Sequence, residues 1–159
     1  MIVFGRAGSE NVASAAGRQY SPDESFCTGF YLIADEATGA LEYAGVGHPP
    51  ALAVGPDGAR QLDSIPGLLG IGMVEGPAVA SDRLEPGESL LIHTDGLTDA
   101  RDLADVLFGT ERITAVLKAH ATAGPSEILD QIDQAVARHV APGQASDDIN
   151  MVLIQSPPR

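Results

Sequence analysis

Short apolar runs, separated by glycine, proline and acidic residues, dominate the chain from residue 26 onward. The runs over 26–34, 41–46 and 51–54 are bounded by turn-forming segments, so they predict strands, and the first two predict a hairpin. A fourth run at 89–94 has the apolar centre that is typical of a buried strand. A last strand is predicted over 149–155.

Two amphipathic helices are predicted between the fourth strand and the last one. Apolar residues recur at helical spacing in both, with Thr110 as the expected cap of the first helix and Ser126 as the cap of the second. The apolar residues of the two faces are Ile113, Val116 and Leu117, and Ile128, Ile132 and Val136. A series of strands, then two helices and a final strand, favours an α+β fold with largely antiparallel sheets.

The chain of 159 residues is long enough for one domain. Residues 1–25 are rich in serine, glycine, alanine and charge, without periodicity, and are predicted to be a poorly ordered lead-in or linker. The domain proper is expected over 26–155, with a tail at 156–159. Within it, the glycine-rich stretch 65–76 favours tight turns over a long regular element.

Charge and cysteine content narrow the class of function. Aspartate and glutamate outnumber lysine and arginine by 22 to 9, which gives a formal net charge of −13. Such a surface repels phosphate backbones and anionic lipids, so we expect neither a nucleic-acid nor a membrane partner. The single cysteine, Cys27, has no internal partner for a disulfide, which suits a reducing compartment and favours the cytoplasm.

Acidic residues stand at the edges of two predicted strands. Asp95 ends the fourth strand and is followed by Gly96, whereas Asp147 and Asp148 directly precede the last strand. If these strands are neighbours, the carboxylates converge, and a hard cation such as Mg²⁺ or Mn²⁺ relieves their repulsion. His93, two residues before Asp95, is a candidate supporting residue. Taken singly, each motif also fits a plain Asp-Gly turn or a solvated acidic pair.

Five motifs in one order resemble a known family over about residues 26 to 155. The sequence resembles the PPM-type, or protein phosphatase 2C-like, enzymes, in the branch of sporulation stage II protein E and the regulators of sigma factors. The motifs are Phe26-Cys27-Thr28-Gly29-Phe30-Tyr31, Tyr43-Ala44-Gly45-Val46-Gly47-His48-Pro49-Pro50, Leu68-Leu69-Gly70-Ile71, Thr94-Asp95-Gly96-Leu97-Thr98-Asp99-Ala100 with Phe108-Gly109, and Asp147-Asp148-Ile149.

The resemblance implies a sandwich of two antiparallel β-sheets flanked by helices. It also implies a two-metal centre, with Mg²⁺ or Mn²⁺, that activates water for attack on a phosphoserine or phosphothreonine. Carried over to this sequence, Asp95 and Asp147 are metal ligands, and no further catalytic residue is expected. Gly96, Asp148 and His93 are expected to support the ligands.

The family also has a third, metal-bridging acid in an Asp-x-x-Gly-His-Gly segment before the first hairpin, and this sequence has no such segment. We therefore expect the chain to correspond to the C-terminal part of the domain. Three hypotheses stay open: a phosphatase acting on a regulatory protein such as an anti-sigma factor antagonist, a non-catalytic interaction module of the same fold, and a fragment completed by another segment. An unpaired sheet edge would favour a homodimer.

Overall fold

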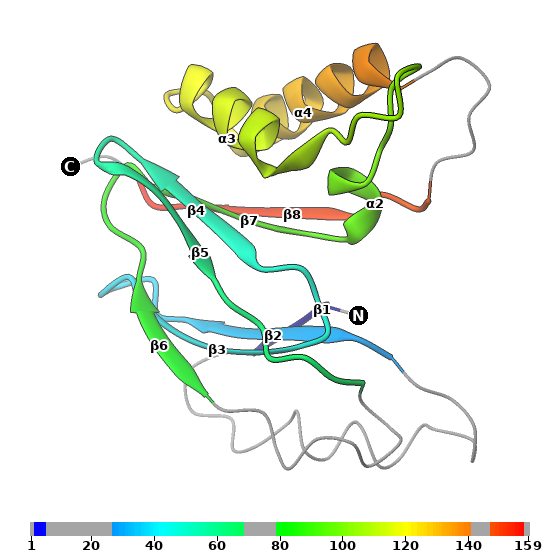
Figure 1. Ribbon diagram of the computed structural model, residues 1–159. Coiled ribbons are helices and arrows are strands. Elements are labelled where there is room, and N and C mark those ends of the chain that lie inside the picture. The colour runs from blue at the N-terminus through cyan, green and yellow to red at the C-terminus, as the bar shows by residue number, and fades with distance from the viewer. Residues whose placement is uncertain (1, 6–26, 69–78, 141–146, 158–159) are drawn as a thin grey trace. The chain divides into compact units, whose positions relative to one another are not determined.

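The structure is a computed structural model that describes residues 2–5, 27–68, 79–140 and 147–157 (Figure 1). The chain divides into two compact units. The first comprises residues 1–50 and 63–84, and the second comprises 51–62 and 85–159. Each unit holds one four-stranded sheet.

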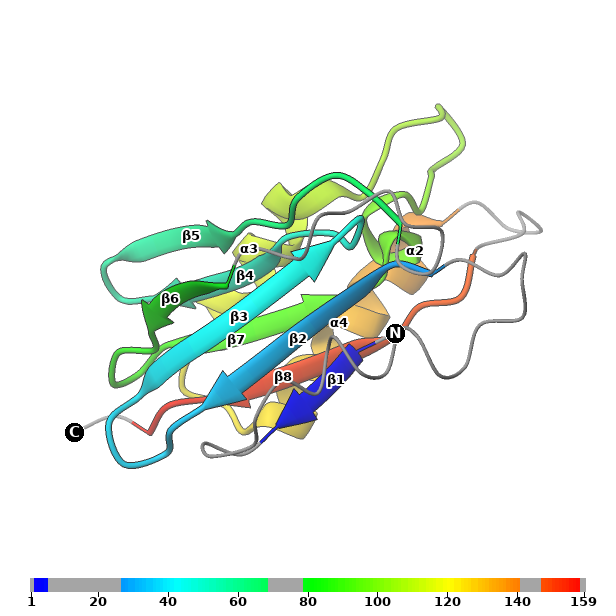
Figure 2. The ribbon, with the colours of Figure 1, turned by 90° about the horizontal axis from the view of Figure 1, so that it is seen from below.

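The sheet of the first unit has the strand order β1-β2-β3-β6 (Figure 2). The predicted hairpin is confirmed, because β2 and β3 pair antiparallel with Phe30 opposite Gly45. β6 also pairs antiparallel with β3, and β1 joins β2 in parallel. The strands are β1 (Ile2–Gly5), β2 (Gly29–Ala34), β3 (Ala40–Val46) and β6 (Ala80–Arg83).

Two of these strands were not predicted. β1 falls inside the stretch interpreted as a lead-in, and the rest of that stretch lies outside the described residues. β6 reads Ala-Ser-Asp-Arg, which has no apolar alternation; it is an edge strand that forms because β3 offers it backbone partners. Most of the glycine-rich stretch 65–76 also lies outside the described residues.

The turn after β3 depends on a glycine. Gly47 has a φ of 60°, a left-handed backbone conformation that residues with a Cβ atom rarely adopt. A Cβ at this position would also collide with the carbonyl oxygen of Gly67. The Gly47 amide donates to the carbonyl of Ile65 at 2.9 Å, and the Ile65 amide donates to Gly45 at 3.0 Å. The glycines of this motif therefore let the segment around Ile65 lie directly against the end of β3.

The sheet of the second unit has the order β5-β4-β7-β8, and all its pairs are antiparallel. β7 is a central strand whose five residues are all buried, which explains its unbroken apolar centre. β8 pairs with it so that His93 lies opposite Met151. The strands are β4 (Ala51–Gly55), β5 (Gly58–Leu62), β7 (Ser89–His93) and β8 (Met151–Gln155).

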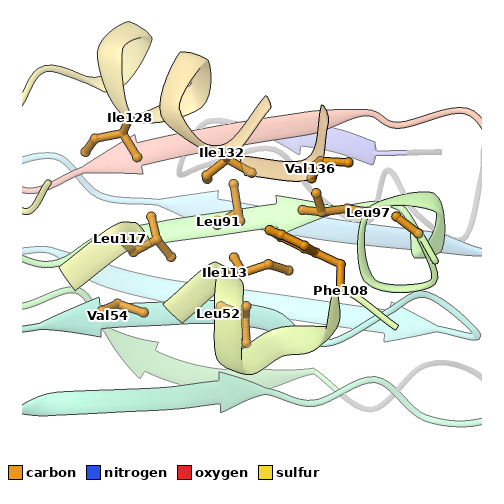
Figure 3. Close-up of a cluster of buried hydrophobic side chains, with 11 residues drawn as sticks. Leu52, Val54, Leu91, Leu97, Phe108, Ile113, Leu117, Ile128, Ile132 and Val136 are labelled. Atoms are coloured by element: carbon orange, nitrogen blue, oxygen red, sulfur yellow. The ribbon is translucent and has the colours of Figure 1, made fainter. Parts of the chain in front are cut away.

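Helices α3 (Gly109–Ala119) and α4 (Pro125–His139) cover one face of this sheet, and the short α2 (Asp95–Thr98) follows β7 directly (Figure 1). Their apolar faces meet the sheet in one buried cluster (Figure 3), in which each fully buried aliphatic side chain contributes about 1.5–3 kcal/mol. The side chains of the cluster are Leu52, Val54, Leu91, Leu97, Ala100, Phe108, Ile113, Leu117, Ile128, Ile132 and Val136. The predicted apolar faces of both helices are therefore found in this core, except that Val116 is partly buried and packs against it.

The predicted helix caps are wrong by two residues. α3 begins at Gly109 after Phe108, and α4 begins at Pro125 after Gly124, so Thr110 and Ser126 lie inside the first turns. Proline suits the first helical position, because its fixed φ is already helical and its missing N–H would have no helical partner there. No helix of the described ranges combines the length and apolarity that crossing a membrane requires.

Candidate metal centre

Asp95 is placed where β7 ends and α2 begins. The backbone is extended at Thr94, with φ −79° and ψ 161°, and turns helical at Asp95. The carboxylate of Asp95 is exposed, and its Oδ1 accepts a hydrogen bond from the Gly96 amide at 3.1 Å. A buried strand thus presents a solvent-facing carboxylate at its rigid end.

The acidic pair that precedes β8 is arranged in a similar way. Asp147 and Asp148 are both exposed. The Oδ1 atom of Asp147 accepts a hydrogen bond from the Asp148 amide at 2.9 Å. Both candidate ligands, Asp95 and Asp147, are therefore oriented by the amide of the next residue.

The structure brings these two segments together. The Thr94 amide donates to the carbonyl of Asn150 at 3.1 Å. The Thr94 hydroxyl donates to the carbonyl of Asp148 at 2.9 Å and accepts from the Asn150 amide at 3.0 Å. A Cβ on Gly96 would lie 2.7 Å from the carbonyl oxygen of Asp148. Asp95 and Asp147 consequently lie at the same end of the β7–β8 pair, although 52 positions separate them in sequence (147 − 95).

His93 does not share the surroundings of Asp95. Alternation along a strand would put both side chains on one side, but the chain leaves the strand at Thr94. His93 is only 1% exposed, whereas Asp95 faces solvent. The His93 Nδ1 atom lies 3.0 Å from the carbonyl oxygen of Thr94. Its contact with the candidate ligands therefore runs through the Thr94 backbone.

The donor atoms at this end of the sheet are carboxylate oxygens, the ligand type that Mg²⁺ and Mn²⁺ prefer. Across the residues that the structure describes, no three or more histidine, cysteine, aspartate or glutamate side chains form a group able to hold a metal ion. Mg²⁺ in phosphate-handling sites is commonly held by one or two carboxylates, with water and substrate oxygens completing its shell. Two exposed carboxylates at one sheet end fit that mode of binding.

The loop of residues 101–107, which leads from α2 to α3, is held by its own polar contacts. Arg101 pairs with Asp105 at 3.1 Å, and the Asp102 carboxylate accepts from the amides of Ala104 and Val106. The Val106 amide lowers the pKa of Asp102 below its usual value most strongly, and the Ala104 amide, His139 and Arg112 add to that direction. The loop nevertheless presents apolar side chains to solvent, and Leu103 is 86% exposed.

Sequence reasoning assigned no role to Thr94 or Asn150. Thr94 is the first residue of the quoted Asp-Gly motif, and Asn150 directly follows the quoted Asp147-Asp148-Ile149 motif. The sequence does place a threonine directly before Asp95-Gly96, and a threonine at such a position commonly caps the start of a helix. Its actual partners are far away in sequence, so pairing of the strands had to be known first.

Comparison with known proteins identifies the family. Residues 10–157 match the family described as Stage II sporulation protein E (SpoIIE). The chain belongs to the SpoIIE family. Protein IcfG of Synechocystis is 33% identical to this chain over 131 residues, which cover 81% of the chain and 20% of IcfG.

Several solved structures resemble this SpoIIE family member, among them one from Bacillus subtilis and one from Mycobacterium tuberculosis. The phosphatase domain of SpoIIE from Bacillus subtilis, presoaked with manganese, has a TM-score of 0.64 at 20% identity and covers 82% of this chain and 56% of its own. The RsbU and RsbW domains of Rv1364c from Mycobacterium tuberculosis have a TM-score of 0.60 at 25% identity, over 79% of this chain and 36% of theirs. The expected α+β fold with two sheets, as in PPM-type phosphatases, is confirmed. The chain spans about half of the Bacillus subtilis domain and a fifth of IcfG.

Proposed function

We propose that this SpoIIE family member supplies Asp95 and Asp147 to the metal centre of a serine/threonine protein phosphatase. The observation that carries the proposal is the junction of β7, α2 and the 147–150 segment, which puts two exposed carboxylates at one end of the β7–β8 pair. Family membership supports the phosphatase class. The whole protein's activity and substrate belong to this proposal as well.

The residues of this chain have distinct proposed roles. Asp95 and Asp147 bind Mg²⁺ or Mn²⁺, and the ions supply an activated water and neutralise charge on the phosphoryl group. Gly96 gives the 147–148 backbone room to approach α2, and Asp148 holds Asp147 through its amide. His93 supports the Thr94 carbonyl from inside the sheet.

Metal dependence is the direct test of this function. We expect Mn²⁺ and Mg²⁺ to bind in a calorimetric titration. We also expect EDTA to abolish hydrolysis of a phosphoserine peptide and added Mn²⁺ to restore it, because the proposed ligands have no affinity for phosphate themselves. The sequence has no Asp-x-x-Gly-His-Gly segment, which carries the metal-bridging acid in the family. Ion binding and hydrolysis are therefore measured in separate experiments. An absence of ion binding would leave the non-catalytic interaction module as the better hypothesis.

We propose that the substrate is a phosphorylated regulatory protein of the anti-sigma factor antagonist class, acting in the cytoplasm. The resemblance to sigma-factor regulators supports the class, and the lone Cys27 supports the compartment. The 101–107 loop supports a protein substrate. It begins just after Asp99 and Ala100, which follow α2, and it exposes Leu103 at 86%, Val106 at 46% and Leu107 at 39%. A contiguous exposed apolar patch is typical of a protein contact, and three exposed apolar side chains on one loop favour such a contact. The homodimer that an unpaired sheet edge would favour remains a prediction.

Replacing Leu103 with serine is expected to impair the reaction with a protein substrate and to leave the reaction with a small substrate unchanged. Burying a leucine side chain is worth about 1.5–3 kcal/mol, so the KM for a phosphorylated anti-sigma factor antagonist should rise about tenfold or more. Hydrolysis of p-nitrophenyl phosphate should not change, because that substrate does not reach the loop. Val79→Ser is the matched control, since Val79 is also a largely exposed apolar side chain, at 69%, and is not part of the 101–107 loop. Equal KM values for the variant and the wild type would remove the loop from the proposal.

A further inference from the structure

The hydroxyl of Thr94 is not used in the way that its position suggests. Thr94 is the N-cap residue of α2, where a threonine side chain usually accepts a hydrogen bond from an amide of the first helical turn. Here the side chain makes no cap bond to the helix. Its hydroxyl instead lies between two backbone groups of another segment, the carbonyl of Asp148 and the amide of Asn150.

These contacts continue the β7–β8 pairing beyond its last residue pair. His93 and Met151 close the regular ladder, and the Thr94 amide then donates to the Asn150 carbonyl at 3.1 Å. One step further, a side chain replaces the backbone as the partner, at 2.9 Å to Asp148 and 3.0 Å from Asn150. A single residue thus bonds both groups that flank Ile149.

Thr94 is also bonded to both segments that carry the candidate carboxylates. On one side of Thr94, the chain enters α2 at Asp95, and the Leu97 amide donates back to the Thr94 carbonyl at 3.2 Å. On the other side, the bonded Asp148 carries the amide that orients the Asp147 carboxylate. A shift of the 147–150 segment relative to Thr94 would therefore change the separation between Asp95 and Asp147.

We propose that Thr94 is a positioning residue that sets the relative placement of Asp95 and Asp147 for metal binding. The metal-binding part of this inference rests on the proposed function. Asp148 and Asn150 are exposed, so water can satisfy their backbone groups when the hydroxyl is removed. The loss of the hydroxyl therefore acts on the position of the segment more than on the stability of the fold.

The test compares Thr94→Val, which has the same shape without the hydroxyl, with Thr94→Ser, which keeps it. We expect Thr94→Val to weaken Mn²⁺ binding about 10- to 100-fold in a calorimetric titration, as removal of a ligand-orienting group commonly does. Thr94→Ser should bind Mn²⁺ as the wild type does. Ser89→Ala, at the far end of β7, is the control for a general weakening of the strand pair.

Amide hydrogen exchange at Asn150, measured without metal, gives a second readout. Exchange should accelerate in Thr94→Val and remain at the wild-type rate in Thr94→Ser and Ser89→Ala, because only the first variant removes the acceptor of this amide. Unchanged exchange in Thr94→Val would overturn the proposal. So would wild-type Mn²⁺ affinity in Thr94→Val, and the proposed function would then still stand. A wild-type protein that binds no Mn²⁺ would overturn the proposed function and, with it, the metal-binding role of Thr94.

Discussion

Replacing Asp95 with asparagine is expected to weaken Mn²⁺ binding more than about 100-fold, because loss of an orienting neighbour alone commonly reduces affinity 10- to 100-fold. Asparagine keeps the size of the side chain and one oxygen that can accept from the Gly96 amide. The fold should therefore persist while the negative charge is lost. Calorimetric titration with Mn²⁺ measures the affinity, and metal-dependent hydrolysis of p-nitrophenyl phosphate should be abolished in the same variant.

Two further substitutions make this prediction specific. Asp147→Asn should have an effect as large as Asp95→Asn, whereas Asp148→Asn should have a much smaller one, because Asp148 contributes through its backbone amide and carbonyl. Asp130→Asn, an exposed carboxylate on α4, is the control for the loss of one surface charge. Wild-type affinity in Asp95→Asn would remove Asp95 from the metal centre, and a larger effect at Asp148 than at Asp147 would exchange their roles.

Replacing Gly96 with alanine is expected to disturb the same centre through packing alone. A Cβ would lie 2.7 Å from the carbonyl oxygen of Asp148 and 3.0 Å from that of Asp147, and neither backbone atom can rotate away. Overpacking of this kind typically reduces the free energy of unfolding by about 1–3 kcal/mol. Without the clash, the substitution would raise the free energy of unfolding, since alanine is more favourable than glycine in a helix by about 1 kcal/mol.

Thermal or urea unfolding measures the stability of Gly96→Ala, and a Mn²⁺ titration shows whether the displaced 147–148 segment still contributes its ligand. Gln134→Ala places alanine at an exposed position of α4, and it should change stability by less than about 0.5 kcal/mol. A Gly96→Ala protein that is as stable as the wild type would show that α2 does not pack closely against Asp147 and Asp148 in solution.

Local patterns were sufficient for the elements that bury a continuous apolar face. The apolar centre of β7 and the helical spacing of Ile128, Ile132 and Val136 predict buried elements, and both lie in the core of the second unit. Polar or very short elements were missed. β5 reads Gly-Ala-Arg-Gln-Leu, with only one large apolar side chain, and lies at a sheet edge. α2 has only four residues, too few to form a helix without tertiary support.

The sequence by itself determined the family, the α+β order and the position of Asp95 at the end of a buried strand, because each depends on neighbouring residues. Tertiary structure alone decided that β8 is the neighbour of β7, and therefore that Asp147 lies near Asp95. It also decided that the Thr94 hydroxyl bonds Asp148 and Asn150 instead of capping α2. The physical reason is that these contacts join residues more than fifty positions apart, and no local spacing encodes which strands pair.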